Sequence, residues 1–150
     1  MRSLPLYLIV FFLISIPSNP IYAENFLQDY IPVIEDGTNF SYAILKSGLK
    51  QDKPGIIIDF TGTKELHYYA DKKTAISLDA VLQITAVSSK LTFLKPVFPP
   101  IGKYYDRGQE KEVNVYAGDF QVFLPIESGI DKIDGSSVKI LLDGVACTDD

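Results

Sequence analysis

Histidine and cysteine are scarce in this 150-residue chain, which has one of each, His67 and Cys147. One histidine alone cannot supply the ligand set of a metal site. A Ser–His–Asp hydrolase also needs a positioned serine, and the chain has no Gly-x-Ser-x-Gly segment that would provide one. The sequence therefore argues against a hydrolase, predicts no cofactor and no metal, and leaves His67 as a packing or hydrogen-bonding residue.

Positive charge is also sparse. The sequence has 14 lysine and arginine residues against 19 aspartate and glutamate residues, a net charge of −5 at neutral pH. The basic residues are scattered, and Lys72 and Lys73 are their only adjacent pair. Nucleic acids and anionic membrane surfaces are bound by basic patches, so neither is expected as a partner.

The first 23 residues have the three-part pattern of a secretory signal peptide. Arg2 supplies the positive charge, residues 4–16 are almost wholly apolar, and Ala23 offers the small residue required at a cleavage site. The apolar run is shorter than the ~20 residues that a membrane-spanning helix needs. We therefore expect cleavage after Ala23 and one mature domain, residues 24–150, which is long enough for a single core.

Export would place the domain in an oxidising compartment, where cysteines usually pair. An unpaired Cys147 then indicates an intermolecular partner, a reactive thiol or a missing mate. Its neighbours Asp149 and Asp150 carry negative charge, which raises the pKa of a thiol and predicts a slow nucleophile. The alternative is a structural role, because a free cysteine commonly packs as a small buried hydrophobe.

Short strand patterns dominate the mature sequence, and it has no convincing helical stripe. Alternation of apolar and polar residues is clearest over residues 76–86, which predicts a half-buried strand. Residues 113–117 and 120–126 alternate on either side of a turn, a pattern typical of a hairpin. About eight strands with a turn every ~8–12 residues predict an all-β protein with an antiparallel β-sandwich fold. The expected strands are residues 40–45, 56–60, 66–70, 76–86, 91–94, 113–117, 120–126 and 138–142.

Three segments are expected to lack regular strands. Residues 24–39 have a mixed composition, and residues 48–55 and 101–111 are polar segments that predict loops. Tyr104 and Tyr105 lie in the last of these segments. Because exposed loop tyrosines often form contact surfaces, this pair is a candidate for partner binding.

A series of short segments from residue 66 onward has a distinctive order. The segments are residues 66–70 (LHYYA), the strand 76–86, Phe98-Pro99, residues 115–122 (VYAGDFQV), 124–126 (LPI), 138–142 (VKILL) and 146–150 (ACTDD). In this order they resemble the N-terminal periplasmic domain of the DsbD family of thiol:disulfide interchange proteins. The resemblance covers residues 53–150 and implies an immunoglobulin-like sandwich with two active-site cysteines near its last strands. Cys147 matches the first of these cysteines, and the second would lie just beyond Asp150.

The resemblance implies thiol–disulfide exchange in the periplasm, with Cys147 as the first redox cysteine attacking a disulfide as its thiolate. The expected partners are periplasmic thioredoxin-like proteins, disulfide isomerases and cytochrome c maturation proteins. The transmembrane and thioredoxin-like domains of a DsbD-type reductase would supply the electrons. The residues that the resemblance assigns to the surroundings of the sulfur, as flanking aromatic residues or as part of a capping loop, are His67, Tyr69, Tyr104, Tyr105 and Asp106.

The alternative hypothesis is a non-catalytic immunoglobulin-like module that binds a protein partner through the Tyr104–Tyr105 segment or an edge strand. In that case Cys147 is structural. Intramolecular exchange needs two thiols, and the mate of Cys147 is missing from the 150 residues. The two hypotheses differ at the thiol, because exchange requires a reactive Cys147 and a binding module does not.

Overall fold

The computed structural model describes residues 8–14, 30–36, 38–64, 66–130 and 136–148. In these ranges the chain forms strands and turns, and neighbouring strands pair antiparallel, so the predicted all-β class is confirmed. No helix in the described part of the chain has the length and apolar character needed to cross a membrane. The predicted cleavage site at Ala23, and the predicted signal peptide apart from residues 8–14, lie outside the described residues.

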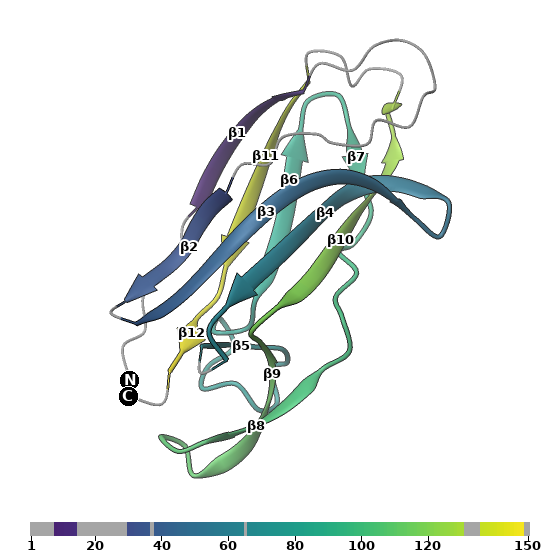
Figure 1. Ribbon diagram of the computed structural model, residues 1–150. Coiled ribbons are helices and arrows are strands. Elements are labelled where there is room, and N and C mark those ends of the chain that lie inside the picture. Colours follow the sequence, from purple (N-terminus) through teal and green to yellow (C-terminus); the bar gives the residue numbers. More distant parts are fainter. Residues whose placement is uncertain (1–7, 15–29, 37, 65, 131–135, 149–150) are drawn as a thin grey trace.

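A five-stranded sheet with the order β2-β3-β4-β10-β7 forms one layer of the molecule (Figure 1). Alternate residues of β3 face inward, as the period-two pattern predicts. Ile58 of β4, for example, pairs with Leu45 of β3 and Val122 of β10, and all three side chains are buried. The strands are β2 (Tyr30–Asp36), β3 (Asn39–Lys50), β4 (Lys53–Gly62), β10 (Phe120–Ser128) and β7 (Thr92–Phe93).

A second sheet, with the order β1-β11-β6, forms the facing layer (Figure 1). Its inward residues join those of the first sheet in one apolar core, and burial of each large side chain contributes ~1.5–3 kcal/mol. Cleavage after Ala23 would remove β1 and leave β11 at the edge of this sheet. The strands are β1 (Leu8–Ile14), β11 (Ser136–Asp143) and β6 (Gln83–Ser88), and their core residues include Val138, Ile140, Leu142 and Ile84.

A small sheet with the order β12-β5-β9-β8 lies at one end of these layers (Figure 1). Aromatic rings join it to the larger core. Phe60 of β4 stacks on Phe120 of β10 with ring centroids 4.5 Å apart, and Tyr116 of β9 lies 5.5 Å from Phe120. Such contacts stabilise by ~0.5–1.5 kcal/mol beyond simple burial, so this cluster holds the small sheet in place. Its strands are β12 (Ala146–Cys147), β5 (His67–Tyr69), β9 (Lys111–Ala117) and β8 (Gly102–Asp106).

The predicted hairpin of residues 113–117 and 120–126 is wrong, although both segments are strands. β9 pairs with β5 and β8, whereas β10 pairs with β4 and β7 in the five-stranded sheet. Gly118, between the two strands, has φ +62°, a left-handed conformation that is costly for residues with a Cβ. The turn therefore passes the chain from one sheet to another and does not fold it back on itself.

The predicted strand over residues 76–86 is also wrong in its first half. Residues 71–80 form turns, and Leu78 is 68% exposed. The Asp71 carboxylate accepts hydrogen bonds from the backbone N–H of Lys73 and Thr74, an arrangement that favours a turn over an extended chain. The first half of the alternating apolar pattern therefore lies in a loop, and only its second half forms a strand, β6.

Strands also occupy all three segments that the sequence predicted as irregular. Residues 24–39 contain β2, and residues 101–111 contain β8. Residues 48–55 belong to a hairpin, in which Gln51 and Asp52 have φ of 53° and 59°, as in a type I′ turn. Polar side chains face solvent at a sheet edge or hairpin end, so local polarity does not separate a loop from such a strand.

Candidate active site

The two-residue strand β12 places Cys147 beside β5, where it pairs with His67. The chain reaches β12 from β11 through Gly144, which has φ +140°. A Cβ at this position would lie 3.0 Å from the Cα of Leu82, closer than such contacts occur without movement of a neighbour. Only glycine combines this backbone conformation with this close approach, so Gly144 sets the position of Cys147.

Alternate residues of the small sheet face opposite sides. Ala146, Tyr68 and Tyr116 form a cross-strand row over β12, β5 and β9, and all three belong to the large apolar core. Cys147 and Tyr69 belong to a second, smaller cluster. The two-residue period of a strand thus separates a packing face from the face that carries the thiol. The other buried members of the small cluster are Ala80, Val113 and Val115.

The loop of residues 71–80 covers part of this cluster. It is tied to β9, because Asn114 donates its backbone N–H to the Thr74 hydroxyl at 2.9 Å and its side-chain amide to Asp71. Cys147 is only 4% exposed as a result of this covering and of the sheet beneath it. The loop residues that contact the cluster are Ala75, Ile76 and Ala80.

A chain of hydrogen bonds leads away from the sulfur. The Cys147 thiol donates to the phenol oxygen of Tyr69 at 3.6 Å, and the Tyr69 hydroxyl donates to Asp106 Oδ2 at 2.8 Å. Gln109 Nε2 donates to both ends of the second bond, at 2.9 Å to the phenol oxygen and 2.6 Å to Asp106 Oδ2. The backbone N–H of Gln109 donates to Asp106 Oδ1 at 2.9 Å. Both carboxylate oxygens of Asp106 therefore have partners.

These contacts determine the protonation states of the site. Burial raises the pKa of the Cys147 thiol, the negative charge of Asp106 raises it further, and the hydrogen bond with Tyr69 opposes the increase. Burial, and then hydrogen bonds to Cys147 and Asp106, raise the pKa of Tyr69. Burial also disfavours the charged form of Asp106, but hydrogen bonds from Gln109 and Tyr69 outweigh it and lower the pKa of this carboxyl. At neutral pH the site therefore holds a neutral thiol, a neutral phenol and one carboxylate.

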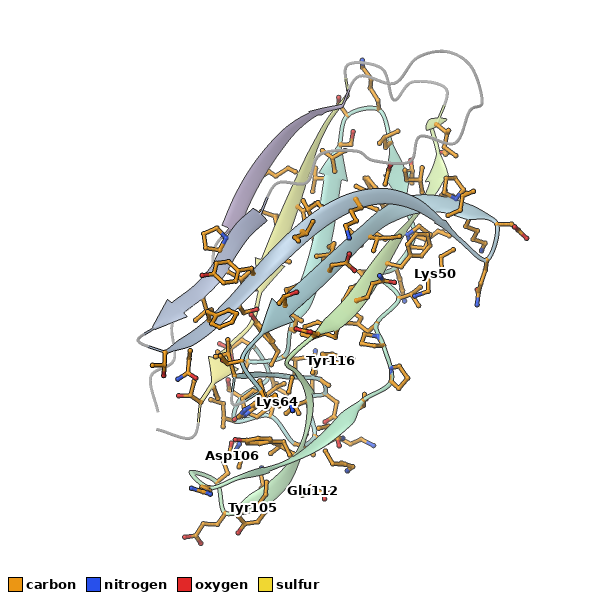
Figure 2. The ribbon with its side chains drawn as sticks, viewed as in Figure 1. Lys50, Lys64, Tyr105, Asp106, Glu112 and Tyr116 are labelled. Atoms are coloured by element: carbon orange, nitrogen blue, oxygen red, sulfur yellow. The ribbon has the colours of Figure 1, made fainter. Side chains whose placement is uncertain are left out.

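Two further aromatic residues lie on the same side of the sheet as the thiol. His67 is 1% exposed, and its ring lies 4.1 Å from that of Tyr104 and 5.9 Å, edge-on, from that of Tyr69. Tyr105, the next residue of β8, is 60% exposed and projects away from the body of the molecule, whereas Asp106 is 5% exposed (Figure 2). The structure thus gathers four of the five predicted surrounding residues near Cys147 and leaves Tyr105 at the surface.

Gln109 belongs to the site and was not singled out from the sequence. It lies in the loop between β8 and β9, three residues after Asp106. An aspartate that begins a turn commonly accepts the backbone N–H of a nearby following residue, and this spacing is the one feature of the sequence that points to Gln109.

The site brings together one thiol, one phenol and one carboxylate. Among the residues that the structure describes, no group of three or more histidine, cysteine, aspartate and glutamate side chains is placed to hold a metal ion. The site can keep a sulfur protonated, offer it a hydroxyl, and hold a carboxylate two hydrogen bonds away. No protein-family model, curated protein or solved structure matches the chain.

Proposed function

We propose that this protein is a thiol–disulfide exchange domain in which Cys147 is the nucleophile. The observation that carries the proposal is the hydrogen bond of the Cys147 thiol to a buried phenol, Tyr69, which is itself bonded to a buried carboxylate, Asp106. A cysteine that only packs needs no polar partner of this kind, because it behaves as a small hydrophobe. Here hydrogen bonds connect the single sulfur to two further polar groups on separate strands, Tyr69 of β5 and Asp106 of β8.

The reaction follows from the chemistry of a single thiol. Cys147 loses its proton, and the thiolate attacks one sulfur of a partner disulfide to form a mixed disulfide. The other partner sulfur leaves as a thiolate and takes up a proton, so atoms and charge balance. A second thiol from outside residues 1–150 then resolves the mixed disulfide, because the chain holds no other cysteine.

The site supports exchange that depends on a docked partner. The sulfur is buried and its pKa is raised, so small oxidants and stray disulfides meet little thiolate. A partner that binds over Cys147 moves the covering residues, excludes water and brings its own disulfide to the sulfur. Slow reaction in isolation and fast reaction in a complex make such a domain selective.

The remaining parts of the proposal extend the resemblance described above. The two facing sheets belong to an immunoglobulin-like sandwich, and the domain works in the periplasm after removal of a signal peptide. Its partners are periplasmic thioredoxin-like proteins and disulfide isomerases, and it receives electrons from the transmembrane and thioredoxin-like domains of a DsbD-type reductase. The hydrogen bond between Cys147, on the last strand β12, and the aromatic residue Tyr69 of β5 supports this assignment.

The test is a trapping experiment with the folded, reduced chain. A thioredoxin-like protein with a single active-site cysteine is loaded with a coloured aromatic thiol, so that exchange releases colour and leaves a protein–protein disulfide detectable by mass. Cys147→Ser is the blank. We expect a stoichiometric adduct with Cys147. No adduct from the native chain would overturn the proposal, provided that the urea-unfolded chain still displaces the coloured thiol from a small disulfide.

A second candidate function, the protein-binding module, is favoured by one observation, the 60% exposure of Tyr105 on β8. Tyrosine supplies much of the contact energy in many interfaces. The two functions are separated by alkylating Cys147 with a small maleimide. Alkylation abolishes adduct formation if the protein exchanges disulfides, and it leaves partner binding intact if the protein only binds.

A further inference from the structure

Gln109 makes an unusual set of bonds for a residue in a surface loop. Its side-chain amide nitrogen lies within hydrogen-bond distance of both groups that follow the sulfur, 2.9 Å from the phenol oxygen of Tyr69 and 2.6 Å from Oδ2 of Asp106. Its backbone N–H occupies the other carboxylate oxygen. Gln109 thus holds the phenol and the carboxylate together by three donated hydrogen bonds.

The number of available protons shows why this arrangement matters for the thiol. A phenol has one proton to donate, and its oxygen can also accept hydrogen bonds. With the thiol protonated, Tyr69 donates to Asp106 and accepts from Gln109 and from Cys147. After the thiol loses its proton, the sulfur has nothing to donate and needs a donor instead. The hydroxyl of Tyr69, 3.6 Å from the sulfur, is the donor that the structure offers.

Turning the Tyr69 hydroxyl toward the sulfur removes one hydrogen bond from Asp106. A buried carboxylate that loses its partners carries a large desolvation penalty, which would oppose the turn. Here Oδ2 keeps the bond from Gln109 Nε2, and Oδ1 keeps the bond from the Gln109 backbone. The phenol oxygen also keeps the bond from Gln109, so its position is fixed while its proton changes direction.

We propose that Gln109 is a positioning residue for the exchange reaction, which holds Tyr69 and Asp106 in place so that the Tyr69 hydroxyl can turn from the carboxylate to the Cys147 thiolate. This inference rests on the proposed function and adds a role to it. Gln109 acts on the sulfur through Tyr69, to which it donates a hydrogen bond. The proton of the thiol leaves to solvent or to the departing partner sulfur, and Asp106 remains a carboxylate throughout.

Residues from β5, β8, β9 and the covering loop surround the sulfur and its hydrogen-bond partners. His67 and Tyr69 face it from β5, and Tyr104 and Asp106 belong to β8. The buried residues of β9 in the cluster, Val113 and Val115, are apolar, and Asp71 of the covering loop is engaged by Asn114.

The experiment compares the pH profile of Cys147 alkylation by iodoacetamide in the full chain and in Gln109→Met, which keeps the side-chain length without donors. Loss of a hydrogen bond that supports a charged group predicts a pH midpoint higher by about one unit, and so about tenfold slower alkylation below that midpoint. A loop that is merely loosened would raise the limiting rate through access and would leave the midpoint where it was. Gln109→Leu, which also lacks donors and adds no charge, should move the midpoint in the same direction and is the second variant if Gln109→Met folds poorly.

The matched control is Gln121→Met. Gln121 also donates its amide to an aspartate, Asp59, at 2.7 Å, but it lies exposed on β10 away from the thiol cluster. We expect its profile to match that of the unaltered chain. A midpoint in both Gln109 variants equal to or lower than that of the unaltered chain overturns the inference. Failure of the unaltered chain to form a protein–protein disulfide would instead overturn the proposed function.

Discussion

The sulfur of Cys147 lies 3.6 Å from the phenol oxygen of Tyr69, although 78 residues separate the two in the sequence. The contact forms because β12 and β5 are neighbours in the small sheet and both residues face away from the large core. It connects the only thiol of the chain to the buried carboxylate of Asp106. Predictions about reactivity, acid stability and glycine substitution follow from this geometry.

Replacement of Tyr69 by phenylalanine removes the hydroxyl that partners the thiol and Asp106. The hydrogen bond with Tyr69 lowers the pKa of Cys147, so its loss raises that pKa and slows alkylation near pH 8. The fold also loses about 1–3 kcal/mol of stability, because the carboxylate keeps fewer partners. Both effects are measured by alkylation kinetics and urea unfolding.

Tyr68→Phe is the matched control for this change. Tyr68 is the preceding residue of β5, but its side chain points into the large core, where burial raises its pKa to about 12. Its hydroxyl does not take part in the bonds to the sulfur, so alkylation of Cys147 should keep the rate of the unaltered chain. Equal slowing by both phenylalanine variants would contradict the assignment of Tyr69.

Asp106→Asn should accelerate alkylation of Cys147 at neutral pH. The charge of Asp106 raises the pKa of the thiol, and asparagine removes the charge while keeping the shape. The variant should also lose about 1–3 kcal/mol of stability, since asparagine cannot accept hydrogen bonds at both positions. Glu127→Gln, an exposed change of the same charge at the far end of β10, is the control and should leave the rate unaltered. Slower alkylation in Asp106→Asn would show that the charge does not act on the thiol.

Asp106 should also contribute to stability in a pH-dependent way. Its pKa is lowered in the folded state, so its ionised form stabilises the fold above the ordinary aspartate pKa of ~3.9. This contribution is lost as the pH falls through the folded-state pKa. The difference in unfolding free energy between the unaltered chain and Asp106→Asn should be constant near neutral pH and should narrow in acid. A difference that is constant throughout the acid range would contradict the lowered pKa.

Gly144→Ala should disturb the site, because a Cβ there meets the backbone of Leu82 at 3.0 Å and φ is +140°. We expect a loss of about 1–3 kcal/mol and faster alkylation of Cys147, as β12 shifts away from β5. Gly118→Ala is the control, because it tests the cost of a left-handed backbone conformation without close contacts to the added Cβ. Its φ of +62° is also left-handed, but the nearest atoms lie 3.9 Å away. It should cost about 1 kcal/mol and leave alkylation unaltered. If the two variants behave alike, crowding at Gly144 does not position the thiol.

The strands of the large core could be predicted from the sequence because their apolar side chains are rich in strand-forming residues or alternate between core and solvent. β11 alternates directly, since Val138, Ile140 and Leu142 are buried and the residues between them are partly exposed. β10 departs from the alternation, because all of residues 122–126 are buried. β8 could not be predicted, because it is an edge strand with solvent on one side and carries polar residues. The false hairpin had a different cause. Two strands next to each other in sequence show the same alternation whether they pair or belong to different sheets.

The site could be predicted in its residue types and only partly in its contacts. The resemblance of the segment order pointed to His67, Tyr69 and Asp106. These residues lie near Cys147 because alternate residues of neighbouring strands face the same side of the small sheet. The pKa of the thiol is raised, as expected, but the larger cause is burial, and the acidic charge that the structure shows is Asp106. Sequence neighbours cannot reveal a charge that reaches the sulfur from another strand.

The most direct measurement compares two rates for the native, reduced chain. One is its reaction with a thioredoxin-like protein that carries an aromatic thiol on its single cysteine, and the other is its reaction with a small disulfide of the same aromatic thiol. We predict that the protein disulfide reacts faster, because docking exposes Cys147 and favours its thiolate. If the native chain reacts faster with the small disulfide, the reaction rate of Cys147 is limited only by the exposure of its sulfur. That result would contradict the account and make Cys147 a structural residue.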